Sequence, residues 1–425
     1  MNIVMLTNTF TPHVGGVARS VEAFSAQYRT RGHRVLVVAP EFPDTPQDEV
    51  DVVRIPAIQN FNGSDFSVVL PVSGLLTEVL DEFQPEIIHS HHPYLLGVTA
   101  LRVARYRNLP LVFTHHTRYE EYTHYVPGNA PMLRRFIIEA AVRYANLADQ
   151  VFAPSESTAE LLRERGVTTA IQTVPTGVTV EHFAHGDGAR FRTLHDIPAG
   201  AFVVGHLGRL APEKNIGFLA AAMTAYGKTE SRAHFLVIGT GPSWQPLLDR
   251  FNREGLGARL HMVGTLKQPD LSDALHAMNV FAFASRSETQ GMVLTEAMAA
   301  GVPAVVLDAP GAREVVKDRS NGRLLRDESP RAFADALKWI AGQPPEQRRA
   351  LEQAARNTAA TFSMQNSANT ALACYETLRS RTSTERAQQE EHWHQLLDLI
   401  KVEWEILKGI GSATESALVK HDEAR

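Results

Sequence analysis

The sequence lacks several features that define other classes of protein. A single cysteine, Cys374, excludes a disulfide framework and a cysteine-based metal site within one chain. No apolar run approaches the ~20 residues that a membrane-spanning helix needs. Residues 1–7 have neither a basic region nor a cleavage site, which favours a strand over a signal peptide. These absences indicate a cytoplasmic protein, and its 425 residues are enough for two or three domains.

Lysine is missing from the first half of the chain. Residues 1–195 contain sixteen arginines and no lysine, and the first lysine is Lys214. Twenty acidic residues give this segment a net charge of −4, within −5 for the whole chain, so no general affinity for nucleic acid is expected. Any anion in this half must therefore be bound by arginine, histidine or backbone N–H groups.

Short apolar runs alternate with helical segments in two successive series. Such runs are typical of strands buried on both faces of a parallel sheet, and their alternation with helices predicts doubly wound α/β domains. The predicted strands are Ile3–Leu6, Val35–Ala39, Val52–Ile55, Ile87–Ser90, Leu111–Thr114, Val151–Ala153, Gln172–Val174, Val203–Leu207, Phe235–Ile238, His261–Val263, Val280–Ala284 and Ala304–Leu307. The predicted helices include Val17–Arg31, Gly74–Phe83, Met132–Ala148, Ile216–Tyr226 and Leu294–Ala300.

The loop-rich segment Glu181–Gly200 separates the two series and is interpreted as a linker. We expect two Rossmann-like domains that face each other across a cleft, where such sheets bind ligands. The predicted domains are 1–185 and 196–365, followed by C-terminal helices in 366–425, the first crossing back to the first domain. From Glu385 onward a stripe that includes Trp393 and Trp404 predicts a helix that packs on the chain itself, forms a homodimer or lies on a membrane.

A glycine pair follows the first predicted strand, in Thr11-Pro-His13-Val-Gly15-Gly16. Glycine lets the backbone approach an anion, and the helix that follows adds positive potential at its N-terminus. A tight turn without a ligand explains the pattern nearly as well.

Two cations follow the first strand of the second series. Arg209 and Lys214 lie five positions apart on the loop and first turn before a helix. Arginine binds a phosphate bidentately and lysine supplies a movable charge, so the pair is a candidate phosphate site. The alternative is a surface ion pair through Glu213.

Two carboxylates follow a later strand, Glu288 on a loop and Glu296 about one turn inside a helix expected to begin near Gly291. Carboxylates bind sugar and ribose hydroxyls, while helix N–H groups bind phosphate oxygens. A capping carboxylate and an ordinary helical glutamate would produce the same pattern.

Five histidines follow two neighbouring strands of the first series: His89, His91, His92, His115 and His116. Their density suggests a metal, but no carboxylate lies at ligand spacing, so we expect neutral, hydrogen-bonding histidines and no metal.

Tyrosines and then arginines follow the histidines in the first half of the sequence. Tyr119, Tyr122 and Tyr125 form either half of a core helix or an exposed wall for an acceptor. The segment Met132–Tyr144 predicts an amphipathic helix whose arginines, Arg134, Arg135 and Arg143, suit an anionic lipid surface or simply face solvent.

Together these segments resemble the retaining glycosyltransferases of family 4, which have the GT-B fold, over about residues 1–378. The strongest elements are the Gly-Arg…Glu-Lys and Glu-x7-Glu segments. Supporting matches are Gly15-Gly16, Thr114-His-His-Thr117, Ala148-Asp149, Gly239-Thr-Gly241 and Gly301-Val-Pro303. The chain departs from the family at Thr176-Gly-Val-Thr179, where many members have Asn-Gly-Val-Asp.

The resemblance implies a role for each matching residue. Catalytic residues would be His116 beside the sugar, Arg209 and Lys214 on the diphosphate, and Glu288 on the donor-sugar hydroxyls. Further donor-binding residues would be Gly15, Gly16, Gly208, Gly291, Met292, Val293 and, on the ribose, Glu296. Acceptor-binding residues would be His13, Arg118, Tyr119, Tyr122 and Tyr125.

The activity that the resemblance implies is transfer of a hexose, glucose from UDP-glucose, to a hydroxyl with retention and without a metal or a cofactor. The segment Thr117–Tyr125 also looks like members that glucosylate membrane diacylglycerol, which implies glycolipid synthesis on the inner face of the cell membrane. Alternatives are mannosyl or glucosyl transfer to a soluble sugar or metabolite, epimerisation of a sugar nucleotide, and binding without catalysis. A phosphorylase would need a pyridoxal lysine, and the first half has no candidate.

Overall fold

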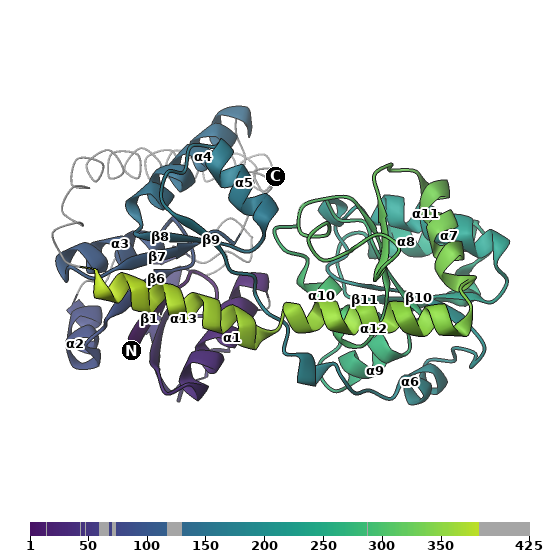
Figure 1. Cartoon of the computed structure of the whole chain (residues 1–425), viewed down its shortest axis with the longest axis horizontal. Helices are drawn as coiled ribbons and strands as arrows, with labels where there is room; N and C mark the ends of the chain where they lie inside the picture. The colour runs from purple at the N-terminus through teal and green to yellow at the C-terminus, as the bar shows by residue number, and fades with distance from the viewer. Residues whose placement is uncertain are drawn as a thin grey trace, which may run out of the picture. The chain divides into compact units, whose positions relative to one another are not determined.

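The computed structural model describes residues 1–13, 15–42, 44–46, 48–58, 68–69, 74–116, 130–286 and 288–381. The chain divides into two compact units, one of Met1–Val174 with the chain from Ala368 onward, and one of Pro175–Ser367. Each unit contains a parallel sheet with helices packed on its two faces (Figure 1). Within the described residues, no helix combines the length and the apolar character that crossing a membrane requires.

The first unit contains a seven-stranded sheet in the order β3-β2-β1-β6-β7-β8-β9, with parallel pairing throughout. Its strands are β1 (Asn2–Leu6), β2 (Arg34–Pro40), β3 (Val52–Ile55), β6 (Ile87–Ser90), β7 (Leu111–Thr114), β8 (Gln150–Ala153) and β9 (Ile171–Thr173), with a short antiparallel pair β4 (Ala57–Ile58) and β5 (Val68–Val69). Its helices are α1 (Gly16–Thr30), α2 (Gly74–Phe83), α3 (Leu96–Tyr106), α4 (Ala130–Leu147), α5 (Glu156–Glu164) and most of α13 (Met364–Ser380).

Alternating side chains of the first sheet enter different layers. Val151 and Ala153 of β8 belong to the core formed with α2, α3, α4 and α5. Phe152 lies between them and points to the opposite face, where its ring stacks on Tyr375 of α13 with centroids 5.9 Å apart. Helix α13 therefore supplies part of the second layer of the first unit (Figure 1).

The second unit contains a six-stranded parallel sheet in the order β12-β11-β10-β13-β14-β15. Its strands are β10 (Phe202–Leu207), β11 (Ala233–Ile238), β12 (Leu260–Gly264), β13 (Val280–Phe283), β14 (Ala304–Leu307) and β15 (Gly322–Leu325). Its helices are α6 (Gly188–Leu194), α7 (Ile216–Thr229), α8 (Trp244–Arg253), α9 (Asp270–His276), α10 (Met292–Ala299), α11 (Pro330–Ala341) and α12 (Pro345–Thr361), with 3-10 turns η3 (Val180–His182), η4 (Pro212–Lys214) and η5 (Gly257–Arg259).

The second sheet is buried on both faces. Val203 packs in a core with α9, α10 and α12, whereas Val204 packs in a core with α7, α8 and α11. Every predicted strand is present, with ends that differ by at most two residues. Strand β15 was not predicted, because this edge strand has only two consecutive apolar residues, Leu324 and Leu325.

The segment predicted as a linker, Glu181–Gly200, lies inside the second unit. It forms η3 and α6, and Phe183, Phe191 and Ile197 are buried in the core of that unit. The chain instead passes between the units after Val174 and after Ser367. Three widely spaced apolar residues were too few to reveal a packed segment.

Gly177 permits a close backbone contact near the start of the second unit. Val178 N donates to Phe362 O at 2.8 Å, and Met364 N donates to Val178 O at 3.0 Å. A Cβ atom on Gly177 would lie only 2.3 Å from the Cα atom of Met364, so the contact requires glycine.

We predict that Gly177→Ala destabilises the second unit by about 1–3 kcal/mol, because the new methyl group overlaps a backbone that cannot rotate away. The measurement is scanning calorimetry. The matched control is Gly217→Ala in α7, where a Cβ meets no described atom within 4 Å and should slightly stabilise the helix. Equal melting temperatures for the two variants would contradict the prediction.

Candidate active site

Two neighbouring strands of the second sheet lead into one charged site. Strands β10 and β13 pair side by side, and their carboxyl ends lead to Lys214 and Glu288. Lys214 Nζ lies 2.5 Å from Glu288 Oε1, and the two side chains are 21% and 18% exposed. The structure thus brings together two residues that lie 74 positions apart in the sequence.

Glycines shape the loop that carries Arg209. Gly208 has a φ of 152°, a conformation that favours glycine. A Cβ on Gly239 would lie 2.0 Å from the carbonyl oxygen of Gly208, and a Cβ on Gly241 would lie 2.4 Å from that of Leu210. The Gly239-Thr-Gly241 motif therefore supports the Arg209 loop from the adjacent strand.

The ion pair considered for the Arg209 loop is present but long. Arg209 Nη1 lies 3.8 Å from Glu213 Oε1, and the Arg209 side chain is 53% exposed. The Glu213 side chain is only 13% exposed, so the more exposed Arg209 is the member of the pair that a ligand can reach.

Helix α10 begins at Met292, next to the position expected from the sequence. Gly291 precedes it in the left-handed conformation, with φ 72°. The amides of Met292 and Val293 lie in the first turn, where a helix offers no internal acceptor. Glu296 lies one turn inside and is only 3% exposed, and a carboxylate is rarely buried without a compensating contact.

Two residues near Glu288 were missed by sequence reasoning. Thr176 N donates to Gln290 Oε1 at 2.6 Å, and Gln290 Nε2 donates back to the Thr176 carbonyl, so Gln290 clamps that backbone. Gly311 has φ 79° and packs so closely that a Cβ would lie 3.0 Å from Glu288 Cβ. The pair Pro310-Gly311 is a turn signal that could have revealed Gly311. Because the clamp uses backbone atoms of Thr176, it does not need the asparagine that many family members have there.

In the first unit the glycine pair lies at the start of α1, after the loop that follows β1. The His13 ring stacks on Phe42 with centroids 5.7 Å apart. A Cβ on Gly15 would lie 3.2 Å from His13 Nε2, whereas a Cβ on Gly16 would meet no described atom within 4 Å. Backbone at Gly16, the first residue of α1, is therefore accessible on its Cβ side.

His89, His91 and His116 form a connected group, as expected from their places on or just after the neighbouring strands β6 and β7. His91 Nδ1 lies 2.9 Å from His116 Nε2, and the His89 and His91 rings are 4.1 Å apart. His89 Nε2 contacts Thr114 Oγ1 at 2.7 Å, while its Nδ1 contacts Tyr375 Oη at 2.7 Å. Tyr375 was not identified from the sequence, because 286 residues separate it from His89.

Burial keeps these histidines neutral. It lowers the pKa of His89 and of His92 to about 3. It also lowers the pKa of His91 and of His116 well below the usual value, with a further lowering from neighbouring histidines. Among the described residues, no three histidine, cysteine or acidic side chains are placed to hold a metal ion.

Several predicted elements lie outside the described residues. They are the acceptor-binding candidates Arg118, Tyr119, Tyr122 and Tyr125 and the helix from Glu385 onward. The predicted amphipathic helix is present as α4. Arg134 and Arg135 are exposed on it, but Arg143 pairs with Glu139 four residues earlier.

Comparison with known proteins identifies the fold and the family. Residues 14–182 match the family model Glycosyltransferase Family 4, and residues 189–358 match Glycosyl transferases group 1. The structure is similar to sucrose-phosphate synthase from Thermosynechococcus elongatus, with a TM-score of 0.73 and 21% identity over 88% of this chain and 98% of that one. The protein is a GT-B glycosyltransferase, an enzyme that transfers a sugar. It belongs to glycosyltransferase family 4.

Two curated relatives differ in the sugar they use. The chain is 26% identical to the alpha-monoglucosyldiacylglycerol synthase of Streptococcus pneumoniae over 80% of this chain and 79% of the relative. It is 29% identical to a GDP-mannose-dependent alpha-mannosyltransferase of Mycobacterium tuberculosis over 91% of this chain and 99% of the relative.

We predict that acid destabilises the first unit through its buried histidines. Unfolded histidines take up protons below pH 6.5, while folded His92 does so only near pH 3. The contribution of neutral His92 to the free energy of unfolding is therefore complete above pH 6.5. Below pH 6.5 the free energy of unfolding falls by up to about 1.4 kcal/mol per pH unit through this residue. Calorimetry between pH 7 and 4.5 should give a shallower decline for His92→Gln, whereas exposed His185→Gln should match the wild type. Parallel curves for His92→Gln and wild type would contradict this.

Proposed function

We propose that the enzyme transfers glucose from UDP-glucose to a hydroxyl of a membrane lipid, diacylglycerol, with retention at the anomeric carbon. The contact between Lys214 and Glu288 at the carboxyl edge of the second sheet carries the proposal of sugar transfer. Similarity to the glucosyldiacylglycerol synthase supports the proposed donor and acceptor.

In the proposed reaction, the bond from the anomeric carbon to the diphosphate breaks and a bond to the acceptor oxygen forms on the same face. The departing diphosphate gains charge and takes the acceptor proton. Arg209, Lys214 and the amides of Met292 and Val293 stabilise that charge, since preorganised donors are most effective where charge develops. Glu288 accepts hydrogen bonds from sugar hydroxyls, and Glu296 binds the ribose.

The first unit supplies the proposed acceptor side. Neutral His116 can accept or donate a hydrogen bond next to the reacting hydroxyl. The proposed contact with an anionic membrane uses Arg134 and Arg135, which are exposed on α4, together with Arg143, whose pair with Glu139 is also exposed. Each arginine near such a surface contributes about 1 kcal/mol, and screening limits its range to about 8 Å. A net charge of −4 on residues 1–195 therefore does not prevent local attraction.

Mannosyl transfer from GDP-mannose is the second candidate, favoured by the similarity to the mycobacterial enzyme over 91% of this chain. Melting assays with UDP-glucose and GDP-mannose distinguish the two. A donor at about 100 times its Kd should add about 2.7 kcal/mol of stability. Mass spectrometry of products from extracted lipids and from soluble sugars then identifies the acceptor.

We predict that Lys214→Ala or Arg209→Ala lowers kcat at least ~10²-fold, the effect of losing one preorganised charge donor. Glu288→Gln should reduce kcat more than nucleotide affinity, and Glu296→Ala should mainly weaken binding of UDP in calorimetry. The matched control is Lys228→Ala, which breaks an ion pair with Glu254 on the surface of the same unit. Wild-type rates for both Lys214→Ala and Arg209→Ala would exclude the diphosphate assignment.

We also predict that sugar transfer persists in excess EDTA, because the proposed reaction uses no metal.

We predict that the enzyme floats with vesicles containing anionic lipid and that Arg134→Glu/Arg135→Glu reduces binding by about 30-fold or more, equivalent to losing ~2 kcal/mol. The control, Arg331→Glu/Arg349→Glu, makes the same charge change at exposed sites of the second unit. If neither the wild type nor the variant floats and soluble sugars are the better acceptors, the lipid proposal fails. If only truncation after Arg379 abolishes binding, the anchor is the C-terminal segment.

A further inference from the structure

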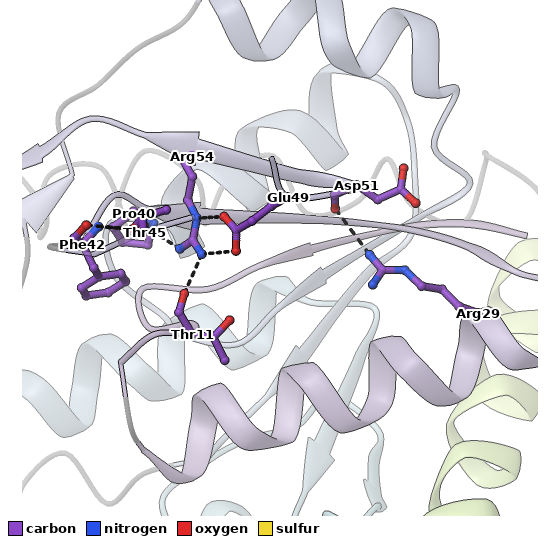
Figure 2. Close-up of polar contacts among 8 residues, drawn as sticks. All are labelled: Thr11, Arg29, Pro40, Phe42, Thr45, Glu49, Asp51 and Arg54. Atoms are coloured by element: carbon purple, nitrogen blue, oxygen red, sulfur yellow. Dashed lines mark hydrogen bonds and ion pairs between the residues drawn. The ribbon is translucent and has the colours of Figure 1, made fainter. Parts of the chain in front are cut away.

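Arg54 of β3 connects three segments at the carboxyl edge of the first sheet. Figure 2 shows its guanidinium between Glu49, Pro40 and Thr11. Nε and Nη2 each lie 2.6 Å from one carboxylate oxygen of Glu49, which makes a bidentate pair. Nη1 donates to the Pro40 carbonyl at 3.0 Å, and Nη2 donates to the Thr11 carbonyl at 2.5 Å.

This arginine is committed to the protein rather than to a ligand. Its side chain is only 10% exposed, that of Glu49 is 15% exposed, and all three guanidinium nitrogens have acceptors. The group also lies over the Phe10 ring, 5.4 Å from its centroid. Because Glu49 already neutralises Arg54, this cation is poorly suited to bind a phosphate.

The loop held by Arg54 carries the glycine pair. Thr11 lies between β1 and α1 together with His13 and Gly15, and Gly16 is the first residue of α1. A second contact comes from the same side, because Phe42, which follows β2, stacks on His13. Phe42 is itself held in a turn, where Thr45 Oγ1 accepts from Phe42 N at 2.9 Å. Arg54 of β3 thus holds the loop at Thr11, as Figure 2 shows, and Phe42 after β2 holds it at His13.

We propose that Arg54, fixed by Glu49, is a positioning residue for sugar transfer: it sets the place of the Thr11–Gly16 loop against the reactants. The inference rests on the proposed function and on the family resemblance, which implies that His13 binds the acceptor and that Gly15 and Gly16 bind the donor. Arginine is required because its planar fork meets a carboxylate and two carbonyls at once, whereas a lysine ammonium has no such geometry.

The test compares Arg54→Lys and Arg54→Ala with matched changes at Arg29. Arg29 also donates to backbone carbonyls, those of Val35 at 2.8 Å and Asp51 at 3.4 Å. Figure 2 shows the Arg29 side chain directed toward Asp51 and away from Thr11. Both Arg54 variants should lose about 10- to 100-fold in kcat/KM, because small misplacement of a binding loop has effects of that size. The Arg29 variants should stay within about 3-fold of wild type, as expected for a change outside the site.

Two further measurements separate positioning from folding. Free guanidinium ion should restore part of kcat/KM to Arg54→Ala and none to Arg29→Ala. Hydrogen exchange of peptides covering residues 7–20 should be faster in Arg54→Lys than in wild type or Arg29→Lys, while exchange in β6 and β7 stays unchanged. If Arg54→Ala does not fold, Glu49→Gln serves in its place, because it keeps the arginine and removes its charged partner. Glu49→Gln should show the same faster exchange of the loop as Arg54→Lys, with a smaller loss of kcat/KM than Arg54→Lys.

The results distinguish failure of this inference from failure of the proposed function. Unchanged loop exchange and unchanged kcat/KM in a folded Arg54→Lys variant would overturn the positioning role, and so would an equal loss in the Arg29 variants. If the wild type transfers no sugar from any nucleotide donor, the proposed function fails, while loop exchange still reports whether Arg54 holds the loop.

Discussion

Parallel pairing is the constraint on which the rest of this structure depends. Every strand of the six- and seven-stranded sheets runs the same way as its neighbours, so each sheet has one edge where all its strands end. Loops that leave this edge meet in space even when long helices separate them in sequence. Lys214 and Glu288 meet for this reason, and the histidines after β6 and β7 meet for the same reason.

Burying polar groups at such an edge requires that their hydrogen bonds be made within the protein. In the first unit, Tyr28 Oη, Tyr375 Oη and His89 form a chain that ends at Thr114, with contacts of 3.3, 2.7 and 2.7 Å. A neutral His89 suits this chain, because one ring nitrogen can accept while the other donates. Helix α13 therefore completes the polar layer beneath the histidines in addition to covering apolar surface.

Sequence reasoning succeeded where a local pattern has one structural solution. Continuous apolar runs predicted the strands, and the glycine before α10 predicted where that helix begins. It failed where the partner is distant: Gln290 with Thr176, Tyr375 with His89, and Arg54 with Thr11. Two of these contacts use backbone atoms, of Thr176 and of Thr11, which carry no sequence signal, and the third joins His89 to a residue far along the chain. Helix α6 was missed because only Phe191 of its seven residues is buried.

The contact between Lys214 and Glu288 also suggests how binding of the proposed donor would rearrange the site. Without a ligand, the ammonium and the carboxylate neutralise each other in a mostly buried place, which limits the cost of holding two charges there. In the proposed reaction, a diphosphate competes with Glu288 for Lys214 because it carries more negative charge. Glu288 then loses its cation and gains sugar hydroxyls as hydrogen-bond donors. A nucleotide diphosphate without its sugar would pair with Lys214 but would give Glu288 no hydrogen-bond donors in exchange. Both the diphosphate and the sugar of the donor are therefore needed to provide partners for Lys214 and for Glu288.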